Sequence, residues 1–401
     1  MTGPPLERRL GLTDAVVIGL GSMIGAGVFV ALAPAADAAG SGLLVGLAVA
    51  AVIAYCNATS SARLAARYPQ SGGTYVYGRE RLGPFWGYLA GWGFLVGKTA
   101  SCGAMALTVG YYVWPAQAHL IAFATVAVLT AINYVGVQKS ALTTRLIVAV
   151  VFMVLAVVVI VVFTSGAAYF SRLQLGGRPG GVLQAAGLLF FAFAGYARIA
   201  TLGEEVRDPT RTIPRAIPLA LGITLAVYAT VAVAALSVLG SDGLARATAP
   251  LADAVRAAGM PGFEPVVRAG AAVAAVGSLL ALLLGVSRTT LAMARDRFLP
   301  QGLSAVHPKF KVPHRAELVV GTVAAVVAAF ADIRGAIGFS SFAVLVYYAV
   351  AHASAWTLGH RILPTVGLVG CLALAFALPL TSVLSGAAVL VLGAAIYTVR
   401  R

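Results

Sequence analysis

The chain alternates between long apolar runs and short polar segments. A run of about 20 apolar residues can cross a lipid bilayer as an α-helix, and about twelve such runs are present. They lie near residues 15–38, 42–65, 85–113, 118–137, 142–165, 182–206, 214–240, 265–294, 315–331, 335–357, 362–379 and 382–399. The pattern predicts an all-α polytopic membrane protein with about 12 transmembrane helices.

Composition supports this class. Hydrophobic residues make up 60% of the chain and charged residues 10%, whereas soluble domains are about 25% charged. The net charge of +15 comes from short basic clusters between apolar runs, so the expected partner is the lipid bilayer and not a nucleic acid. Cys56, Cys102 and Cys371 stand in apolar runs without metal-ligand spacing. No metal and no cofactor are expected.

The distribution of Lys and Arg predicts the orientation. If residues 1–14 are a cytoplasmic tail, 20 of the 28 basic residues fall in cytoplasmic segments and six in external ones. Such an excess of positive charge marks the cytoplasmic side of a membrane protein. We therefore expect both termini of this multi-pass protein to be cytoplasmic, at the cytoplasmic (inner) membrane. The charged start lacks an A-x-A cleavage pattern, so no removable signal peptide is predicted.

The first apolar run contains an unusual concentration of glycine. Gly19, Gly21, Gly25 and Gly27 lie within nine positions. Irregular backbone at membrane depth is tolerated where it lines a cavity or contacts a ligand, and free amides at such a break can hold an anion. The alternative is a helix-packing surface, because Gly21 and Gly25 form a small-xxx-small pair.

A second glycine-interrupted run, residues 190–205, lies five spans later. Interrupted helices at corresponding positions of two halves are typical of transporter binding sites. Because five is odd, the second copy would be inverted. The predicted organisation is one integral membrane domain with a first repeat at 15–165, a second at 182–357 and two further helices at 362–399.

Four segments resemble motifs of the amino acid-polyamine-organocation (APC) superfamily of transporters, and they occur in the family's order. The bacterial cationic-amino-acid-transporter-like branch is the most similar. The matching segments are 21–29 in the first helix, 67–77 after the second, 204–217 between the sixth and seventh, and 287–296 at the end of the eighth.

The resemblance implies a leucine-transporter-type fold, a 5+5 inverted repeat with two additional helices. An α-amino acid would lie between the breaks of helices one and six. Amides of the first break would bind its carboxylate, and carbonyls of the second would accept from its ammonium. The substrate-binding residues predicted in this way are Ser22, Met23, Ile24, Gly25, Ala26, Gly27, Phe190, Phe193, Ala194, Gly195, Tyr196 and Arg198.

Charged residues within the spans are candidates for coupling or gating, because a charge at bilayer depth is costly. Lys98 would replace a coupling cation, titrate, or bond structurally to carbonyls of a broken helix. Arg198 would contact the substrate carboxylate or pair with Glu204 or Glu205. The two glutamates would serve as a gate or pair with the basic cytoplasmic cluster.

Two positions depart from the family pattern. Where relatives carry an aspartate after the Gly-aromatic pair of helix six, this chain has Ala197 followed by Arg198. Proton-coupled relatives carry a lysine in helix five, where this chain has Phe152. Lys98 would supply that charge from helix three. Arg198 disfavours a cationic substrate side chain, so neutral or acidic amino acids are expected.

The predicted function is secondary active transport of an amino acid by alternating access, coupled to a proton or to exchange and independent of sodium. Alternatives are an amino acid/polyamine antiporter, a nutrient receptor that does not transport, and an intramembrane enzyme. No metal-binding acid or His/Glu cluster supports the enzyme, and no filter-like sequence supports a channel.

Overall fold

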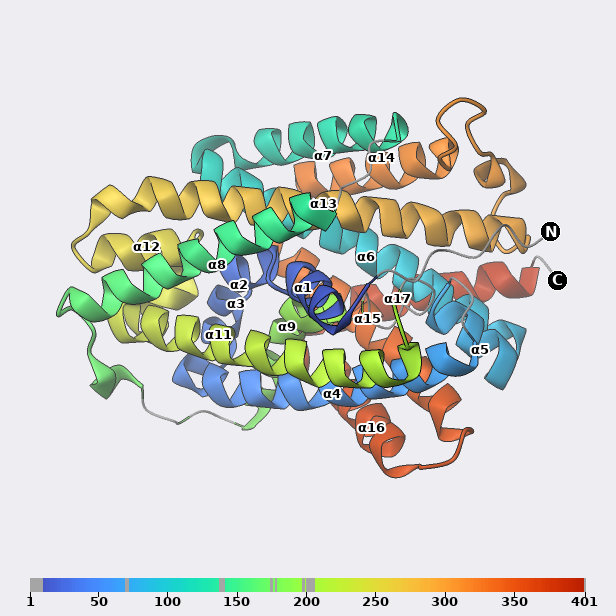
Figure 1. Ribbon diagram of the computed structural model, residues 1–401, viewed down its shortest axis with the longest axis horizontal. Coiled ribbons are helices and arrows are strands. Elements are labelled where there is room, and N and C mark those ends of the chain that lie inside the picture. Colours follow the sequence, from blue (N-terminus) through green and yellow to red (C-terminus); the bar gives the residue numbers. More distant parts are fainter. Residues whose placement is uncertain are drawn as a thin grey trace.

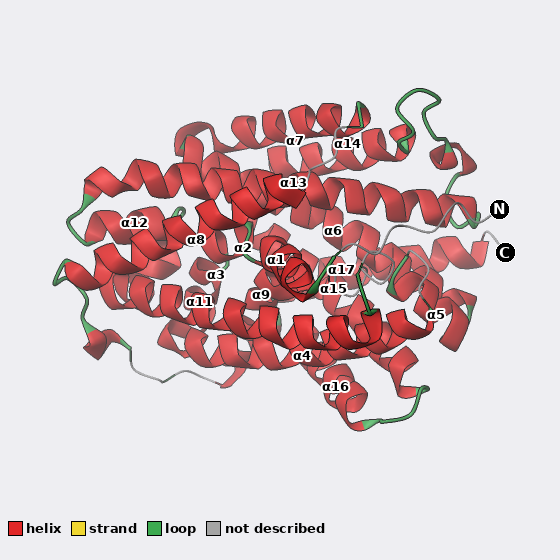
Figure 2. Ribbon diagram, viewed as in Figure 1, coloured by secondary structure: helices red, strands yellow, loops and turns green. Residues whose placement is uncertain are grey.

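The computed structural model describes residues 10–68, 72–136, 141–173, 176, 179–196, 199 and 206–399. Figure 2 shows that this part of the chain consists of helices joined by short loops. Its only recorded β-type pairing within those ranges is an isolated bridge between Leu10 and Val206, where the Arg207 amide donates to the Leu10 carbonyl at 2.8 Å. The predicted all-α class is confirmed.

The helices of the first half follow the predicted spans within a few residues. They are α1 (Leu12–Met23), α2 (Ala26–Val30), α3 (Leu32–Ala39), α4 (Leu43–Arg67), α5 (Thr74–Leu82), α6 (Pro84–Val113), α7 (Ala118–Tyr134) and α8 (Ala141–Thr164). Helix α5 follows the turn at Gly72 and Gly73, whose φ values of 130° and 59° suit glycine. Residues Thr74–Gly78 are buried, so α5 packs against the bundle.

The helices of the second half of the chain also follow the predicted spans within a few residues. Its helices are α9 (Pro179–Phe193), the short 3₁₀ helix η4 (Ala194–Tyr196), α11 (Pro209–Arg246), α12 (Pro250–Ala257), α13 (Glu264–Arg295), α14 (His314–Phe330), α15 (Ile333–Trp356), α16 (Ile362–Ala377) and α17 (Leu380–Val399). Helix α11 bends at Gly240, where φ is 68°. Residues 197–198 and 200–205 of the predicted sixth span lie outside the described residues.

The first and sixth spans occupy the middle of the bundle. In Figure 1, α1 and α9 lie between a layer containing α4 and α11 and a layer containing α6 and α13. Helix α1 packs against α11, α8 and η4, and α9 packs against α4 and α3. Helix α15 lies against α6 and α16. Within the most apolar stretch of α15, 83% of the residues are buried, whereas the corresponding share for α17 is 22%. Helix α17 is therefore peripheral.

The outer faces of the bundle are apolar. Met153 and Ile160 of α8 are 65% and 60% exposed, Phe376 of α16 is 65% exposed and Val391 of α17 is 68% exposed. Large apolar side chains in such numbers on the outside suit contact with lipid. Nine segments of the described chain are long and apolar enough to cross a membrane.

The loops divide between the two ends of the bundle. Helix α5 and the end of α17 lie at one end, and α12 lies at the other (Figure 1). The basic residues Arg79 and Arg81 of α5 thus share an end with the carboxyl end of α17. Below, these are called the α5 end and the α12 end.

Candidate substrate-binding site

Helix one is interrupted at Ile24 and Gly25. Neither residue is helical, with φ and ψ of −81° and 69° at Ile24 and −120° and −138° at Gly25. The Ile24 amide donates to the Leu20 carbonyl at 2.7 Å, and the Gly25 amide donates to the Met23 carbonyl at 2.8 Å. Both amides are therefore occupied within the break, and the same is true of those of Ser22 and Met23 inside α1.

These bonds narrow the predicted carboxylate site. The sequence predicts donors from Ser22 to Gly27, but only the first turn of α2 presents amides without an acceptor in their own helix. Those amides belong to Ala26, Gly27 and the next residue, Val28. The helix continues through Ala31, which is itself α-helical, into α3, so its positive end faces the break.

Helix six is interrupted after Phe193. Helix α9 ends there, and Ala194, Gly195 and Tyr196 form one 3₁₀ turn. The carbonyls of the last turn of α9 consequently lack α-helical partners. Arg198, Glu204 and Glu205 lie outside the described residues, so their predicted roles stay predictions.

The two breaks are in backbone contact at two glycines. A Cβ added to Gly27 would lie 2.6 Å from the Cα of Ala192, and one added to Gly195 would collide with the carbonyl of Ser22. Any side chain at either position would separate the breaks. Contact between the breaks thus accounts for Gly27 and Gly195, whereas a Cβ at Gly21 would meet Val148 of α8, as expected for a helix-packing surface.

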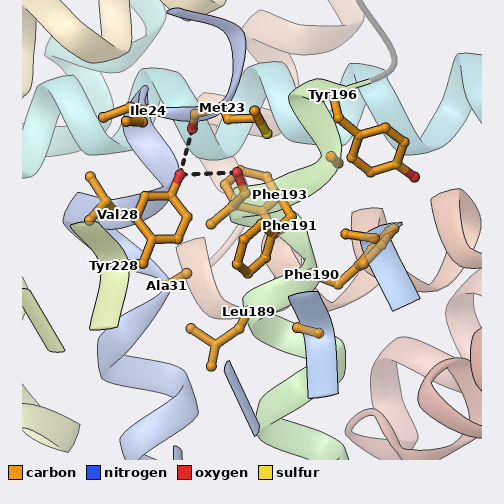
Figure 3. Packing of buried hydrophobic residues seen from close by; sticks show 14 of the residues in the cluster. Met23, Ile24, Val28, Ala31, Leu189, Phe190, Phe191, Phe193, Tyr196 and Tyr228 are labelled. Atoms are coloured by element: carbon orange, nitrogen blue, oxygen red, sulfur yellow. Dashed lines mark hydrogen bonds between the residues drawn. The ribbon is translucent and has the colours of Figure 1, made fainter. Parts of the chain in front are cut away.

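The hydroxyl of Tyr228 on α11 joins the two breaks. It lies 2.6 Å from the Met23 carbonyl oxygen and 3.1 Å from the Ala192 carbonyl oxygen; Figure 3 shows both contacts. The first carbonyl ends α1, and the second belongs to the last turn of α9. The single hydroxyl proton is shared between two acceptors, and the Met23 carbonyl also accepts from the Gly25 amide at 2.8 Å.

Aromatic rings surround the second break (Figure 3). The ring of Phe193 lies 5.2 Å from that of Tyr228. Phe190 and Tyr196 both lie against Tyr348 of α15, at centroid distances of 5.9 and 5.4 Å. All three predicted aromatic site residues, Phe190, Phe193 and Tyr196, are buried.

Helices α6 and α13 form the remaining walls of the first break. A Cβ at Gly25 would collide with the Ser278 hydroxyl of α13. Ala26 packs in one apolar cluster with Val109 of α6 and Ala275 of α13. Among the described residues, the polar side chains recorded against the first break from other helices are the hydroxyls of Ser278, Tyr228 and Thr224, the last of which donates to the Met23 sulfur at 3.8 Å.

Lys98 lies at the middle of α6 and is 8% exposed. The thiol of Cys102, one turn along the same face, is the only electrostatic partner of its ammonium recorded among the described residues. Cys102 packs with Leu279 and Leu283 of α13 and Val320 of α14. Lys98 therefore lies on the side of α6 that faces these two helices.

The α5 end is closed by a contact between two of the motif segments. The Tyr75 hydroxyl and the Arg79 guanidinium of α5 both donate to Asp296 at the end of α13, the second at 2.6 Å. Arg79 also lies over the ring of Tyr75, 5.5 Å from its centroid. Burial, and then the carboxylate of Asp296, raise the pKa of Tyr75. The phenol consequently stays a hydrogen-bond donor at neutral pH.

The α12 end contains a cavity of about 400 Å³ beside α3 and α9, the parts of the two broken helices that lie toward this end. It is bounded by residues of α3, α9, the start of α15 and the segment that begins α17, and its charged lining residues are Asp37, Asp332 and Arg334. Arg334 pairs with Asp37 at 3.2 Å and donates to the Ala245 carbonyl. Asp332 caps α15 by accepting from the Gly335 amide at 2.9 Å.

An all-helical membrane bundle in which two interrupted helices meet at the centre is the architecture of a secondary transporter. No three His, Cys, Asp or Glu side chains group as a metal site within the described ranges. The model of the amino acid permease family matches residues 14–366. The chain belongs to the amino acid permease family, so it is a transporter and not an enzyme.

Named relatives agree with this class. An uncharacterized transporter of Mycobacterium tuberculosis (strain ATCC 25618 / H37Rv) is 74% identical over 404 residues, covering 99% of this chain and 92% of that protein. The branched-chain amino acid permease BcaP of Bacillus subtilis (strain 168) is 28% identical over 80% of this chain and 74% of its own length. The human cationic amino acid transporter 4 is 28% identical over 86% and 58%.

Sequence reasoning missed Tyr228 and Ser278. Tyr228 is the only aromatic residue of the predicted span 214–240, and Ser278 interrupts an apolar run. An isolated aromatic or hydroxyl residue in a span is a weak signal, because neither reveals which helix it will contact.

Proposed function

We propose that this permease moves a neutral amino acid across the cytoplasmic membrane by alternating access, without sodium and with a proton or an exchanged amino acid as the driving partner. The substrate carboxylate would bind the amides of Ala26 and Gly27, and its ammonium the carbonyls at the end of α9. The supporting observation is the contact of the two breaks at Gly27 and Gly195, with Tyr228 bonded to both.

The apolar surroundings support a neutral side chain. Met23, Ile24, Phe190 and Phe193 are buried around the breaks, and a charged substrate side chain would lose its hydration there. The relative named for branched-chain amino acids makes L-leucine the first probe. The inverted repeats at 15–165 and 182–357, with both termini cytoplasmic, belong to the same proposal.

Counterflow in proteoliposomes tests transport directly. We expect radiolabelled L-leucine to exchange with internal L-leucine equally well with and without sodium, and faster than L-glutamate, L-arginine or spermidine. A receptor that only binds would show no counterflow. Faster exchange of arginine or spermidine would contradict the neutral substrate, and exchange that needs sodium would contradict the proposed coupling.

Gly195→Ala tests the contact of the breaks, with Gly222→Ala as its matched control. A methyl at Gly195 overlaps the Ser22 carbonyl, whereas one at Gly222 of α11 meets no atom within 4 Å. Overpacking costs about 1–3 kcal/mol, so L-leucine counterflow should fall about tenfold or more. Equal rates in the two variants would show that the breaks need not touch.

Lys98 is proposed to supply the positive charge of a coupling cation, and two substitutions separate its possible actions. Lys98→Met should abolish proton-driven L-leucine uptake. Lys98→Arg keeps a charge that does not titrate, so uptake should survive if the charge is fixed and disappear if Lys98 must release a proton. Wild-type pH dependence in Lys98→Met would contradict either role.

A further inference from the structure

A buried polar cluster joins α4, α15 and α16 beside the break of helix six. His352 of α15 is fully buried. Its Nδ1 lies 3.0 Å from the Ser60 hydroxyl, and its Nε2 bonds to the Asn57 amide oxygen. The Cys371 thiol donates to the same oxygen at 3.2 Å. A Cβ on Gly367 would collide with the imidazole, so that glycine makes room for the ring.

These partners can accommodate either protonation state of the imidazole. The Asn57 oxygen only accepts, so Nε2 carries a hydrogen and Nδ1 accepts from Ser60 when the ring is neutral. A proton added at Nδ1 would reverse the second bond. The Ser60 hydroxyl would then accept it and turn its own hydrogen to the carbonyl one turn back in α4, as serines in helices do.

The surroundings of the ring contain no counter-ion among the described residues. Its titratable neighbours are Tyr348 on its own helix, Tyr196 of η4, and the thiols of Cys371 and Cys56, which interact with each other. The nearest guanidinium on α4, that of Arg63, donates instead to the carbonyls of Gly359 at 2.6 Å and His360 at 3.2 Å. The closed cluster therefore suits the neutral ring, since a buried unpaired charge is costly.

The cluster is linked to the break through Tyr196. The Tyr196 hydroxyl interacts with both Tyr348 and the Asn57 amide. Yet the Tyr196 hydroxyl and the Asn57 Nδ2 atom are both buried without a hydrogen bond of good geometry in the part of the chain that the structure describes. Movement of the break would change this contact, and with it the access of water to the imidazole.

We propose that His352 is the proton-binding residue of the transport cycle. It is neutral while Asn57, Ser60 and Gly367 enclose it, and it takes up a proton when the break moves and water reaches the ring. An imidazole in water titrates near pH 6.5, within the physiological range. The proposal rests on the alternating-access function above, and it gives the driving proton a site even if the charge on Lys98 is fixed.

Titration of the ligand-free protein tests proton binding without any transport. The full chain, labelled with ¹⁵N-histidine and reconstituted in nanodiscs, would be followed by NMR from about pH 8 to about pH 5. The resonances of the five histidines are assigned by single His→Gln variants. Because alternating access requires the ligand-free protein to visit states in which the break has moved, we expect the His352 signals to change from the neutral to the protonated form over this range. A ring that stays neutral throughout would overturn the proposal.

Transport of L-leucine tests coupling. With the outside about two pH units more acidic, coupling to one proton can support accumulation of about a hundredfold. His352→Gln should lose this accumulation and keep counterflow at equal pH within about threefold, because neither break loses a contact to substrate. His119→Gln, a histidine of α7, is the matched control. Wild-type accumulation in His352→Gln would overturn the proposal.

The two measurements separate the possible failures. If wild-type protein exchanges none of the probes, the proposed function fails while the titration still decides whether His352 binds a proton. If His352→Gln does not fold, Ser60→Ala replaces it. Loss of the Nδ1 partner should then shift the His352 titration by at least about half a pH unit. An unshifted titration in Ser60→Ala would contradict the assigned bond and with it the proposal.

Discussion

At the α5 end of the bundle the Asp296 carboxylate is held by two donors from one helix, whereas beside the cavity at the α12 end the Arg334 guanidinium pairs with the single carboxylate of Asp37. Asp296 accepts from both Tyr75 and Arg79, and the ring of Tyr75 packs against Phe298 at 6.0 Å. At the α12 end, Arg334 is paired with Asp37, whose side chain is 66% exposed.

The difference indicates which of these two contacts opens more readily. Exposed ion pairs contribute about 0–1 kcal/mol, and the pair at the α12 end also borders the 400 Å³ cavity. The α5 end adds a hydrogen bond and ring packing to its ion pair. We therefore expect the Asp296 contact to be the more stable of the two.

Asp296→Asn should have the largest effect on this balance. It removes the charge from the acceptor of Arg79 and Tyr75, with an expected cost of about 2 kcal/mol. The thermal midpoint should fall and L-leucine counterflow should decrease about tenfold. The midpoint can be read with a thiol-reactive dye, because Cys56, Cys102 and Cys371 are free and buried.

The control for Asp296→Asn is Asp242→Asn, which removes an exposed acid near the carboxyl end of α11, at the α12 end of the bundle. A midpoint and counterflow rate equal to those of the control would mean that the Asp296 contacts do not keep the α5 end closed.

Tyr75→Phe should have an intermediate effect, about 1 kcal/mol, because Asp296 keeps Arg79 and only one hydrogen bond is lost. The pH dependence has a defined sign. Burial and Asp296 raise the pKa of Tyr75, so the advantage of wild type over Tyr75→Phe should be constant below the ordinary tyrosine value of about 10 and be lost above it. Melting curves of both proteins from about pH 6 to about pH 11 measure it. An advantage that grows at high pH would refute the assignment.

Arg334→Gln should have the smallest effect on stability, below about 1 kcal/mol. Salt screens exposed pairs, so the difference from wild type should shrink further as ionic strength rises. Arg246→Gln, an exposed arginine at the same end, serves as the control. A loss larger than that of Asp296→Asn would reverse the comparison of the two ends.

The sequence predicts the fold and the breaks more fully than the contacts between them. Apolar runs and glycine-rich interruptions are local patterns, so the spans and the irregular backbone at Gly25 and Gly195 could be located. The bond from Tyr75 to Asp296 joins residues 221 positions apart, although both motifs were recognised separately. Such pairings depend on how helices pack, and the residues alone do not specify them.

The binding site shows the same limit. The predicted amides of Ile24 and Gly25 are occupied by carbonyls within the break itself, a result of backbone geometry that composition does not reveal. The Tyr228 hydroxyl bonds to backbone oxygens, so no side-chain pattern in the sequence identifies its partners. His352, Asn57 and Ser60 lie on two spans almost 300 positions apart in the chain, and only their packing unites them.

The bridge between Leu10 and Val206 has a mechanical consequence. It ties the segment that precedes α1 to the segment that leads into α11. Helix α1 therefore cannot swing away without pulling on the start of α11. Because the Arg207 amide and the Leu10 carbonyl make this link, most side-chain changes leave it intact. Proline at position 207 would remove the donor, and α1 and α11 would then be free to move separately.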